Sequence, residues 1–289
     1  MSPQLKGILI TGLGVLVIVP DSLMIRLIDA HEMTIVFWRA GMSCMVMALW
    51  CTLTGGWRRL GPAALLFAIT EAAGTVLFIV ALENTSVAST LFLVSTSPIF
   101  SALLSRFALG ERLSRRMILT ILGALMGIAV IASASTDGDP QRWIGDLAAL
   151  GVALSLGIAF TTVRHTPDLP IVPALTLAYG IATLVAAAFA PTFMLHGVEW
   201  VWIAINGGIF VPLGFALMAI GPRYITSAEV SLLLLLEAVL APILVWAVLG
   251  ENPGQRVLLG GAIVLVVLLI SNLVSLKRRS VKPAPSQPV

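Results

Sequence analysis

Residues 86–116 carry the sequence SVASTLFLVSTSPIFSALLSRFALGERLSRR, a hydrophobic segment that ends in a cluster of arginines. A related segment, TSAEVSLLLLLEAVLAPILVWAVLGE, occupies residues 226–251. At a constant offset of 140 the two segments share Ala88/Ala228, Leu109/Leu249 and the pairs Gly110-Glu111 and Gly250-Glu251. Four arginines surround the first Gly-Glu pair, whereas only Arg256 follows the second. Because basic loops stay on the cytoplasmic side of a membrane, this asymmetry predicts two similar halves that insert in opposite directions.

The composition indicates that lipid is the solvent of this chain. Of its 289 residues 58% are hydrophobic and only 11% are charged, and the mean hydropathy is +1.03. Soluble domains carry about 25% charged residues. The formal net charge of +3 is small and comes mostly from loops, so we expect no nucleic-acid partner. The fold class predicted is an all-α integral membrane protein.

Ten hydrophobic segments are long enough to cross a bilayer, whose ~30 Å core needs about 20 helical residues. Their approximate bounds are 6–28, 33–54, 61–82, 86–108, 114–134, 143–163, 171–193, 199–219, 226–249 and 254–276. Most loops between them are short, so consecutive helices are expected to run antiparallel.

The basic residues predict the topology of these segments. With the N-terminus placed inside, 13 of the 17 Lys and Arg residues fall at the cytoplasmic ends, which is a strong positive-inside bias. Both termini are therefore expected in the cytoplasm. We expect a first five-helix repeat over residues 1–138, an inverted second repeat over 139–276 and a disordered cytoplasmic tail over 277–289. Inverted repeats are typical of secondary transporters, which bind substrate near the midplane between the repeats.

Four charged residues fall inside the predicted helices: Asp21, Arg39, Glu71 and Glu237. A charge at the membrane centre costs roughly 2.5–3.5 kcal/mol on insertion scales, so each needs a partner or a role. Asp21 and Arg39 either form a structural ion pair across helices, or Arg39 binds the carboxylate of a substrate. Glu237 either binds a substrate ammonium group, carries a proton, or caps a neighbouring kink as a protonated acid, and the same alternatives apply to Glu71.

Proline and hydroxyl residues predict interruptions in several helices. Ser95, Ser97 and Pro98 lie near the centre of the fourth segment. We expect a break in the helix there, since proline removes a backbone donor and frees a carbonyl. Pro242 in the ninth segment and Pro212 in the eighth are expected to act in the same way, and Pro98 and Pro242 are candidate hinges. Irregular backbone is tolerated in a membrane where it lines a cavity. The alternative for each serine is a hydrogen bond back to its own helix.

Further polar and aromatic residues complete the candidate substrate site. Asn206 precedes two glycines and offers one amide to a cavity, while Phe78, Tyr179 and Trp246 lie near the membrane centre. The candidate substrate-binding set is therefore Ser95, Ser97, Glu237, Arg39, Phe78, Tyr179, Asn206 and Trp246. In the fifth segment Gly123-x-x-x-Gly127 is a small-residue packing motif that joins helices within the chain or between protomers, and we favour the former.

The sequence carries no motif of a common enzyme or cofactor site. His31, His165 and His196 lie in different loops, and we find no zinc spacing, no HExxH, no GxSxG elbow and no phosphate-binding glycine loop. We therefore expect no catalytic residues, no metal and no cofactor, and the chain is not expected to be an enzyme.

These features together resemble the drug/metabolite transporter superfamily, in particular its ten-helix EamA-like amino-acid exporters. The resemblance covers about residues 5–276 and rests on the two Gly-Glu helix ends, on Ser97-Pro98-Ile99 and on Arg39, which matches an arginine common in the family's second helix. The chain departs from the family at Ile18-Val19-Pro20-Asp21, where a Trp-Gly pair is usual, and at Glu237-Ala238, where Glu-Pro is usual.

The resemblance implies a secondary transporter that exports amino acids, with aromatic and other neutral ones favoured, or similar small metabolites. The expected partners are this small-molecule substrate and the lipid bilayer, and no oligomer is required. The expected location is the cytoplasmic membrane of a bacterium. The alternatives are an exporter of nucleosides or cationic compounds, or a membrane-embedded enzyme or channel-like protein that uses Asp21, Glu71 and Glu237.

Overall fold

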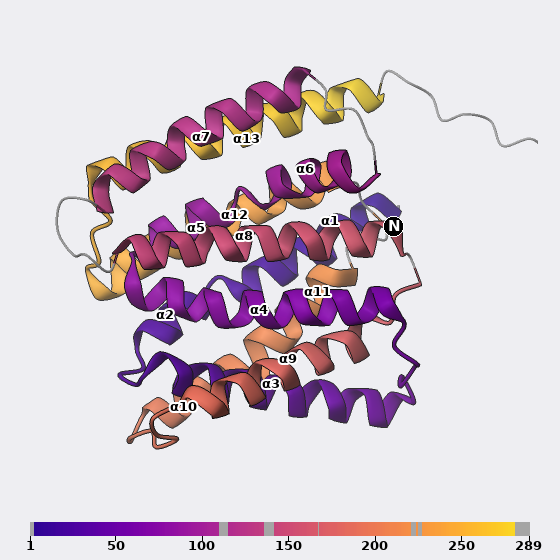
Figure 1. Cartoon of the computed structure of the whole chain (residues 1–289), viewed down its shortest axis with the longest axis vertical. Coiled ribbons are helices and arrows are strands. Elements are labelled where there is room, and N and C mark those ends of the chain that lie inside the picture. The colour runs from indigo at the N-terminus through magenta and orange to yellow at the C-terminus, as the bar shows by residue number, and fades with distance from the viewer. Residues whose placement is uncertain are drawn as a thin grey trace, which may run out of the picture.

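The computed structural model describes residues 3–109, 115–135, 142–166, 168–220, 224 and 227–280, and within these ranges every regular element is a helix (Figure 1). Nine helical segments are long and apolar enough to span a membrane, and Leu233–Leu249 is a shorter apolar helix. The helices cross the molecule ten times. In chain order they are α1 (Pro3–Ile18) with α2 (Asp21–Arg26), α3 (Glu32–Thr54), α4 (Pro62–Asn84), α5 (Val87–Val94) with α6 (Ser97–Leu109), α7 (Arg115–Ser135), α8 (Arg142–His165), α9 (Ile171–Phe189), α10 (Glu199–Ile205) with η1 (Asn206–Phe210) and α11 (Val211–Ile220), α12 (Ser227–Leu249) and α13 (Gln255–Ser280).

Local sequence explains where several helices begin and end. His31 precedes α3 and its Nδ1 accepts a hydrogen bond from the backbone N–H of Met33, and Gly55 ends α3 with a φ of 61°. Ser86 caps α5 through its side chain, which accepts from the N–H of Ser89. Such caps satisfy N–H groups that have no partner inside the helix, while a glycine adopts the left-handed backbone of a helix end without a Cβ clash.

In the described ranges three of the crossings are interrupted, and a buried polar residue lies at each interruption: Asp21, Thr96 and Asn206. The first crossing breaks at Pro20, the fourth breaks between Val94 and Ser97, and the eighth contains the π-helix η1 just before Pro212. The break predicted in the fourth segment is confirmed, and the irregularity predicted near Pro212 lies just before that residue. The expected interruption at Pro242 is wrong, because α12 continues through this residue from Ser227 to Leu249.

The two halves of the chain run in opposite directions. In Figure 1, α1 starts at the end of the molecule where the N-terminus and the C-terminal end of α13 lie, whereas α8 starts at the other end. The first helix of each half packs against the other half: α1 packs against α11 and α12, while α8 packs against α4, α5 and α6. The predicted repeat boundary at residue 138, Glu111 and the tail 281–289 lie outside the described residues, and Lys277–Ser280 extend α13 beyond the expected end.

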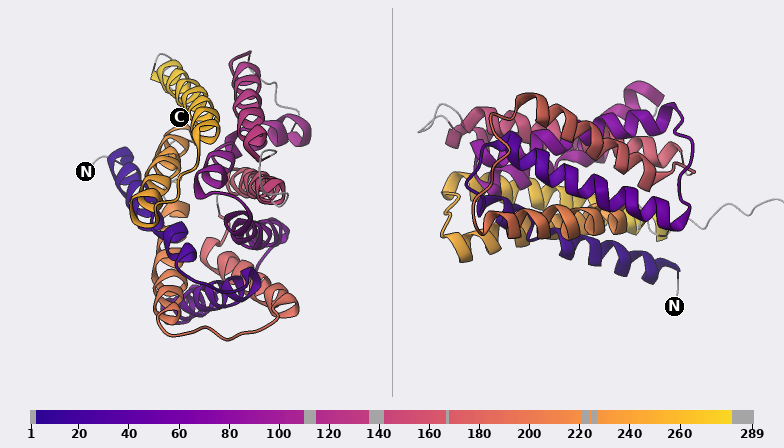
Figure 2. Two further views of the ribbon diagram at one scale, coloured as in Figure 1. Left: turned by 90° about the vertical axis from the view of Figure 1, so that its left-hand side faces the viewer. Right: turned by 90° about the horizontal axis from the view of Figure 1, so that it is seen from below.

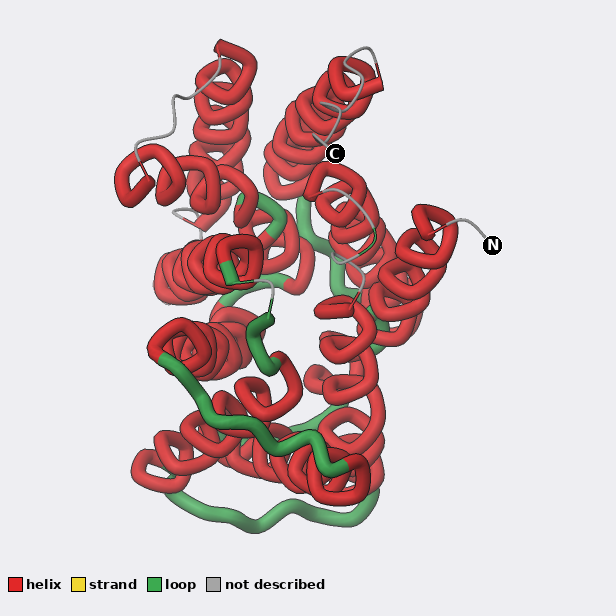
Figure 3. Tube along the Cα trace, turned by 90° about the vertical axis from the view of Figure 1, so that its right-hand side faces the viewer, coloured by secondary structure: helices red, strands yellow, loops and turns green. Residues whose placement is uncertain are grey.

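Seen along the helices, the bundle is an elongated ring (Figure 2). α7 and α13 pack together at one end of this ring, and α3 and α9 pack together at the other. Figure 3 shows the same arrangement from the opposite side. Large apolar side chains such as Leu119, Leu184 and Leu259 are exposed on the outside, as expected where lipid is the solvent.

The small residues of α7 allow its close contact with α13. A Cβ on Gly127 would lie 2.7 Å from the carbonyl oxygen of Gly260, and one on Gly260 would lie 2.6 Å from that of Gly127. A Cβ on Gly123 would meet Val267 at 2.8 Å. The predicted packing motif therefore joins two helices of one chain.

Candidate functional site

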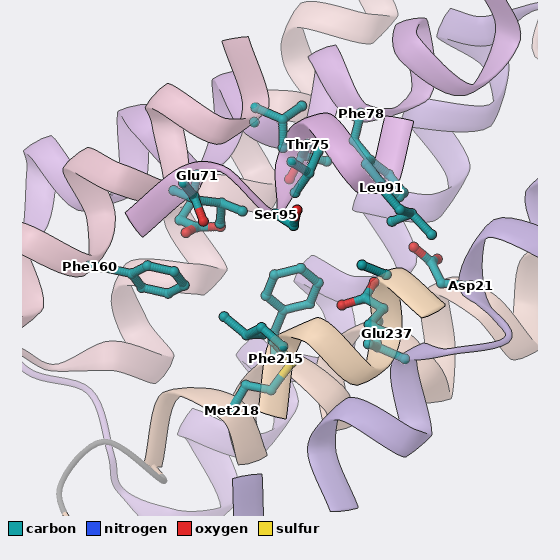
Figure 4. Close-up of a pocket in the computed structure, with 18 of the residues that line it drawn as sticks. Asp21, Glu71, Thr75, Phe78, Leu91, Ser95, Phe160, Phe215, Met218 and Glu237 are labelled. Atoms are coloured by element: carbon teal, nitrogen blue, oxygen red, sulfur yellow. The ribbon is translucent and has the colours of Figure 1, made fainter. Parts of the chain in front are cut away.

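A cavity of about 140 Å³ lies inside the ring of helices, between the two halves (Figure 4). An apolar cavity of roughly 150 Å³ is enough to hold benzene, so this one has room for a small organic molecule or side chain. Helices of both halves contribute to its wall. The lining residues are Ile18, Asp21, Arg39, Phe67, Glu71, Gly74, Thr75, Phe78, Leu91, Val94, Ser95, Ser97, Pro98, Val152, Leu156, Phe160, Val163, Leu175, Phe215, Met218, Leu234, Leu235, Glu237 and Ala238.

Two carboxylates enter this cavity from different halves of the chain. Glu71 comes from α4 and is only 7% exposed, and Glu237 comes from α12. Figure 4 shows Glu71 and Ser95 on one wall, with Phe215, Met218 and Glu237 on the facing wall. Within the described residues neither carboxylate has a hydrogen-bond or ion-pair partner. Because burying a charge without a partner is costly, these two groups are the strongest candidates for contact with a ligand.

Asp21 and Arg39 form a buried ion pair at another part of the wall. Arg39 Nη2 donates to Asp21 Oδ2 at 2.9 Å and to Oδ1 at 3.1 Å, and both side chains are 3% exposed. Asn206 joins the pair, since Arg39 Nε donates to Asn206 Oδ1 at 3.1 Å while Asn206 Nδ2 donates to Asp21 Oδ1 at 2.7 Å. Of the two alternatives expected for Asp21 and Arg39, the structure therefore has the ion pair between helices.

This triad joins two irregular pieces of backbone to the continuous helix α3. Asp21 follows the break at Pro20, and Asn206 begins the π-helix η1. A Cβ at Gly207 would lie 2.6 Å from the carbonyl oxygen of Arg39, so η1 packs directly on the backbone of α3. Ser43 Oγ adds hydrogen bonds to the carbonyl oxygens of Arg39 (2.9 Å) and Gly207 (2.8 Å). The contacts join the first repeat to the second.

The break between α5 and α6 lines the cavity through Ser95, Ser97 and Pro98. Ser95 Oγ donates to the carbonyl oxygen of Phe92 at 2.7 Å, and Thr96 Oγ1 donates to that of Leu93 at 2.6 Å. These hydrogen bonds satisfy carbonyl oxygens near the interruption. For Ser95 this is the expected alternative, in which the hydroxyl bonds back to its own helix. No hydrogen bond of the Ser97 hydroxyl is found in the part of the chain that the structure describes.

Four of the predicted site residues do not line the cavity. Trp246 is 55% exposed and faces outward, whereas Tyr179 and Asn206 are fully buried behind the wall. Pro242, the second candidate hinge, lies within the continuous helix α12 and does not line the cavity. Phe78 does line it, and its ring centre lies 5.8 Å from Cζ of Arg39.

Several lining residues could not be predicted from the sequence, most clearly Phe67, Phe160 and Phe215. Each is an apolar residue in an apolar helix, and only the rotation of that helix in the bundle decides whether it faces lipid, core or cavity. The irregular backbone near Pro212 was the one signal that pointed toward the neighbourhood of Phe215.

At the end of the molecule away from the termini, a second polar cluster connects several helices. Arg26 Nε lies 3.2 Å from Glu251 Oε2, and Arg26 Nη2 donates to the carbonyl oxygen of Thr85 at 2.7 Å. Glu251 Oε1 also accepts from the N–H of Val87 at 2.9 Å, at the start of α5. A carboxylate at a helix N-terminus is favourable because unpaired N–H groups give that end a partial positive charge. The cluster therefore fastens the ends of α2 and α12 to the start of α5.

Comparison with known proteins places this arrangement in a family. The model of the EamA-like transporter family matches residues 5–133 and 143–273, one copy in each half. The chain belongs to the EamA-like transporter family. This EamA-like protein is therefore a multi-pass membrane transporter of the drug/metabolite transporter superfamily, and its family indicates a transporter rather than an enzyme.

Two individual proteins are similar to this chain over about two thirds of its length. An uncharacterized transporter of Archaeoglobus fulgidus is 24% identical over 201 residues, which cover 67% of this chain and 70% of the relative. A probable terminal-alkyne amino-acid exporter of Streptantibioticus cattleyicolor is 30% identical over 214 residues, which cover 68% and 67% of the two chains. A solved crystal structure with 20% identity covers 94% of this EamA-like chain and 98% of its own, with a TM-score of 0.67, and shows a shared fold.

Proposed function

We propose that this EamA-like transporter exports amino acids or similar small metabolites from the cytoplasm by alternating access. The observation that carries the proposal is the cavity between two oppositely directed halves, with a carboxylate on each that has no partner in the described ranges. The probable amino-acid exporter at 30% identity supports the substrate class. Aromatic and other neutral amino acids are favoured.

The geometry supports a rocking motion of one half against the other. A substrate in the cavity touches helices of both halves, so relative rotation of the halves exposes it to alternate sides of the membrane. The end with both termini carries most of the basic residues, and we assign it to the cytoplasm of a bacterial cell. The contacts of Arg26 and Glu251 close the other end and have to break before substrate leaves there.

Transport is tested with the purified chain in lipid vesicles, by loading a mixture of labelled amino acids and measuring their release. We expect saturable flux of at least one neutral amino acid and none in empty vesicles. Absence of flux for every amino acid contradicts the substrate class. Repeating the assay with an imposed pH gradient separates proton antiport, in which flux follows the gradient, from uniport, in which it does not.

The orientation is tested with single cysteines in a chain whose Cys44 and Cys51 are replaced by alanine. A membrane-impermeant maleimide added to intact cells should label Asn252→Cys, which lies in the loop before α13. It should leave Arg59→Cys, which lies in the loop before α4, unlabelled until the cells are opened. Labelling of Arg59→Cys alone means that the protein has the reverse orientation in the membrane. Labelling of both cysteines from outside contradicts the expectation that these two loops lie on opposite sides of the membrane.

A further inference from the structure

The cavity lining contains one cationic side chain, Arg39, which is paired with Asp21, and two glutamates that have no partner among the described residues. We propose that the cavity is a cation site, in which Glu71 and Glu237, which lie on facing walls, attract the ammonium group of the substrate, while Arg39 is already paired with Asp21 and is not left to hold a carboxylate. The substrates that fit this chemistry are small primary amines with an apolar body, including amino-acid amides. This inference rests on the proposed export function and, within its amino acids and similar small metabolites, moves the preference from neutral amino acids to amines without a free carboxylate.

The first support is the balance of charge on the wall. Four titratable residues line the cavity: Asp21, Arg39, Glu71 and Glu237. The guanidinium of Arg39 is within hydrogen-bond distance of both oxygens of Asp21. A substrate carboxylate therefore has to compete with Asp21 for this cation, inside a protein where a charge pair is much stronger than in water. The pair leaves no net positive charge on the lining.

The second support is the state of the two glutamates. Glu71 is more than nine-tenths buried, lines the cavity and has no partner among the described residues, and Glu237 enters the same space from the other half. An ammonium group carries three donors and matches such acceptors. Because α4 and α12 belong to different repeats, a cation in the cavity is attracted by one carboxylate from each of the two halves that are expected to move.

The third support is the apolar part of the lining. Phe67, Phe78, Phe160 and Phe215 contribute aromatic rings, and the remaining lining is mostly aliphatic. The faces of aromatic rings attract cations, most strongly in desolvated sites. The same rings bury a hydrocarbon body but offer no hydrogen-bond donor to a carboxylate. The aromatic lining and the free carboxylates therefore favour the same class of ligand.

The test uses four ligands that share one side chain: isopentylamine, leucinamide, leucine and 4-methylpentanoate. Their equilibrium binding to the purified full chain in detergent is measured by calorimetry. We expect the amine and the amide to bind at least about 10-fold more tightly than leucine, and the acid not to bind. A charge-assisted hydrogen bond contributes about 1.5–3 kcal/mol, so Glu71→Gln and Glu237→Gln should each weaken amine binding roughly 10-fold or more.

Glu83→Gln is the matched control, because Glu83 is an exposed carboxylate on the same helix as Glu71. It should leave amine binding unchanged, and size-exclusion profiles should show that all three variants are folded. The proposal is overturned if the acid binds as tightly as the amine, if both glutamine variants retain full amine binding, or if no member of the series binds.

Flux measured on the same preparations separates this inference from the proposed export function. Binding of the amine that depends on the glutamates, without flux of any ligand in vesicles, supports the cation site and contradicts the carrier. Equal flux of leucine and isopentylamine that both glutamine variants retain supports the carrier and contradicts the cation site.

Discussion

Two groups of charged side chains line the cavity, and the groups differ in how their charges are matched. Asp21, Arg39 and Asn206 bond to one another in a closed set. Glu71 and Glu237 line the same cavity but have no partner in the described parts of the chain. The difference indicates that the first group stabilises the fold and that the second is available to a ligand. The following predictions test this distinction, from the largest effect on stability to the smallest.

Arg39→Ala should destabilise the protein most, because it leaves the carboxylate of Asp21 buried without its cation. Removal of one partner of a buried ion pair costs about 3–5 kcal/mol, and thermal unfolding in detergent measures the loss. The triple variant Asp21→Leu/Arg39→Met/Asn206→Leu is the control, since apolar residues of similar volume then replace the whole hydrogen-bonded set and should recover much of the stability. A single variant as stable as the parent contradicts the structural role.

Gly207→Ala should have the next largest effect, because its Cβ would meet the carbonyl oxygen of Arg39 at 2.6 Å. Overpacking of this kind costs roughly 1–3 kcal/mol. Gly208→Ala is a matched control one residue away, where an added Cβ meets nothing within 4 Å. Equal melting temperatures for the two variants would show that η1 does not depend on its close contact with α3.

Glu251→Gln should lower stability only slightly, by about 0.2–1 kcal/mol, since its ion pair with Arg26 is partly open to solvent. Its larger effect should be on access to the cavity, because Glu251 also accepts from the start of α5. A single cysteine at Leu91, on the cavity wall, should then react faster with an impermeant maleimide added from outside. An unchanged rate means that this cluster does not control that end.

Glu71→Gln and Glu237→Gln should change stability least, because neither carboxylate loses a partner on substitution. We expect melting temperatures equal to or above that of the parent, since an amide is cheaper to bury than a carboxylate. These measurements run beside the binding experiment on the same proteins. A loss as large as that of Arg39→Ala would place the two glutamates with the structural group and remove the contrast.

Much of the fold could be predicted from the sequence, since hydrophobic length and basic loop residues are local properties. All ten predicted segments correspond to helical crossings, and the packing motif of Gly123 and Gly127 joins α7 to α13 as expected. The break at Ser95–Pro98 was predictable because proline and hydroxyl residues disturb a helix wherever it lies. Pro242 was misjudged because a single proline also fits within a continuous helix when its neighbours satisfy the freed carbonyl.

The site itself was predicted only in part. The sequence identified Arg39, Asp21, Glu71 and Glu237 because charge is rare in a membrane segment, but it could not distinguish a paired charge from a free one. Trp246 was misplaced because its helix is apolar on every side, so its direction is not encoded in the pattern of residues around it.

The sequence by itself determined that this chain is a ten-segment membrane protein with two related halves, because hydrophobicity and charge along the chain are enough to fix membrane spans. The tertiary structure decided which charges are neutralised and which face the cavity. Asp21 and Asn206 are 185 residues apart, and only the packing of α2, α3 and η1 brings them to the same guanidinium. With Arg39 paired in this way, Glu71 and Glu237 are the carboxylates of the cavity that have no partner in the part of the chain that the structure describes.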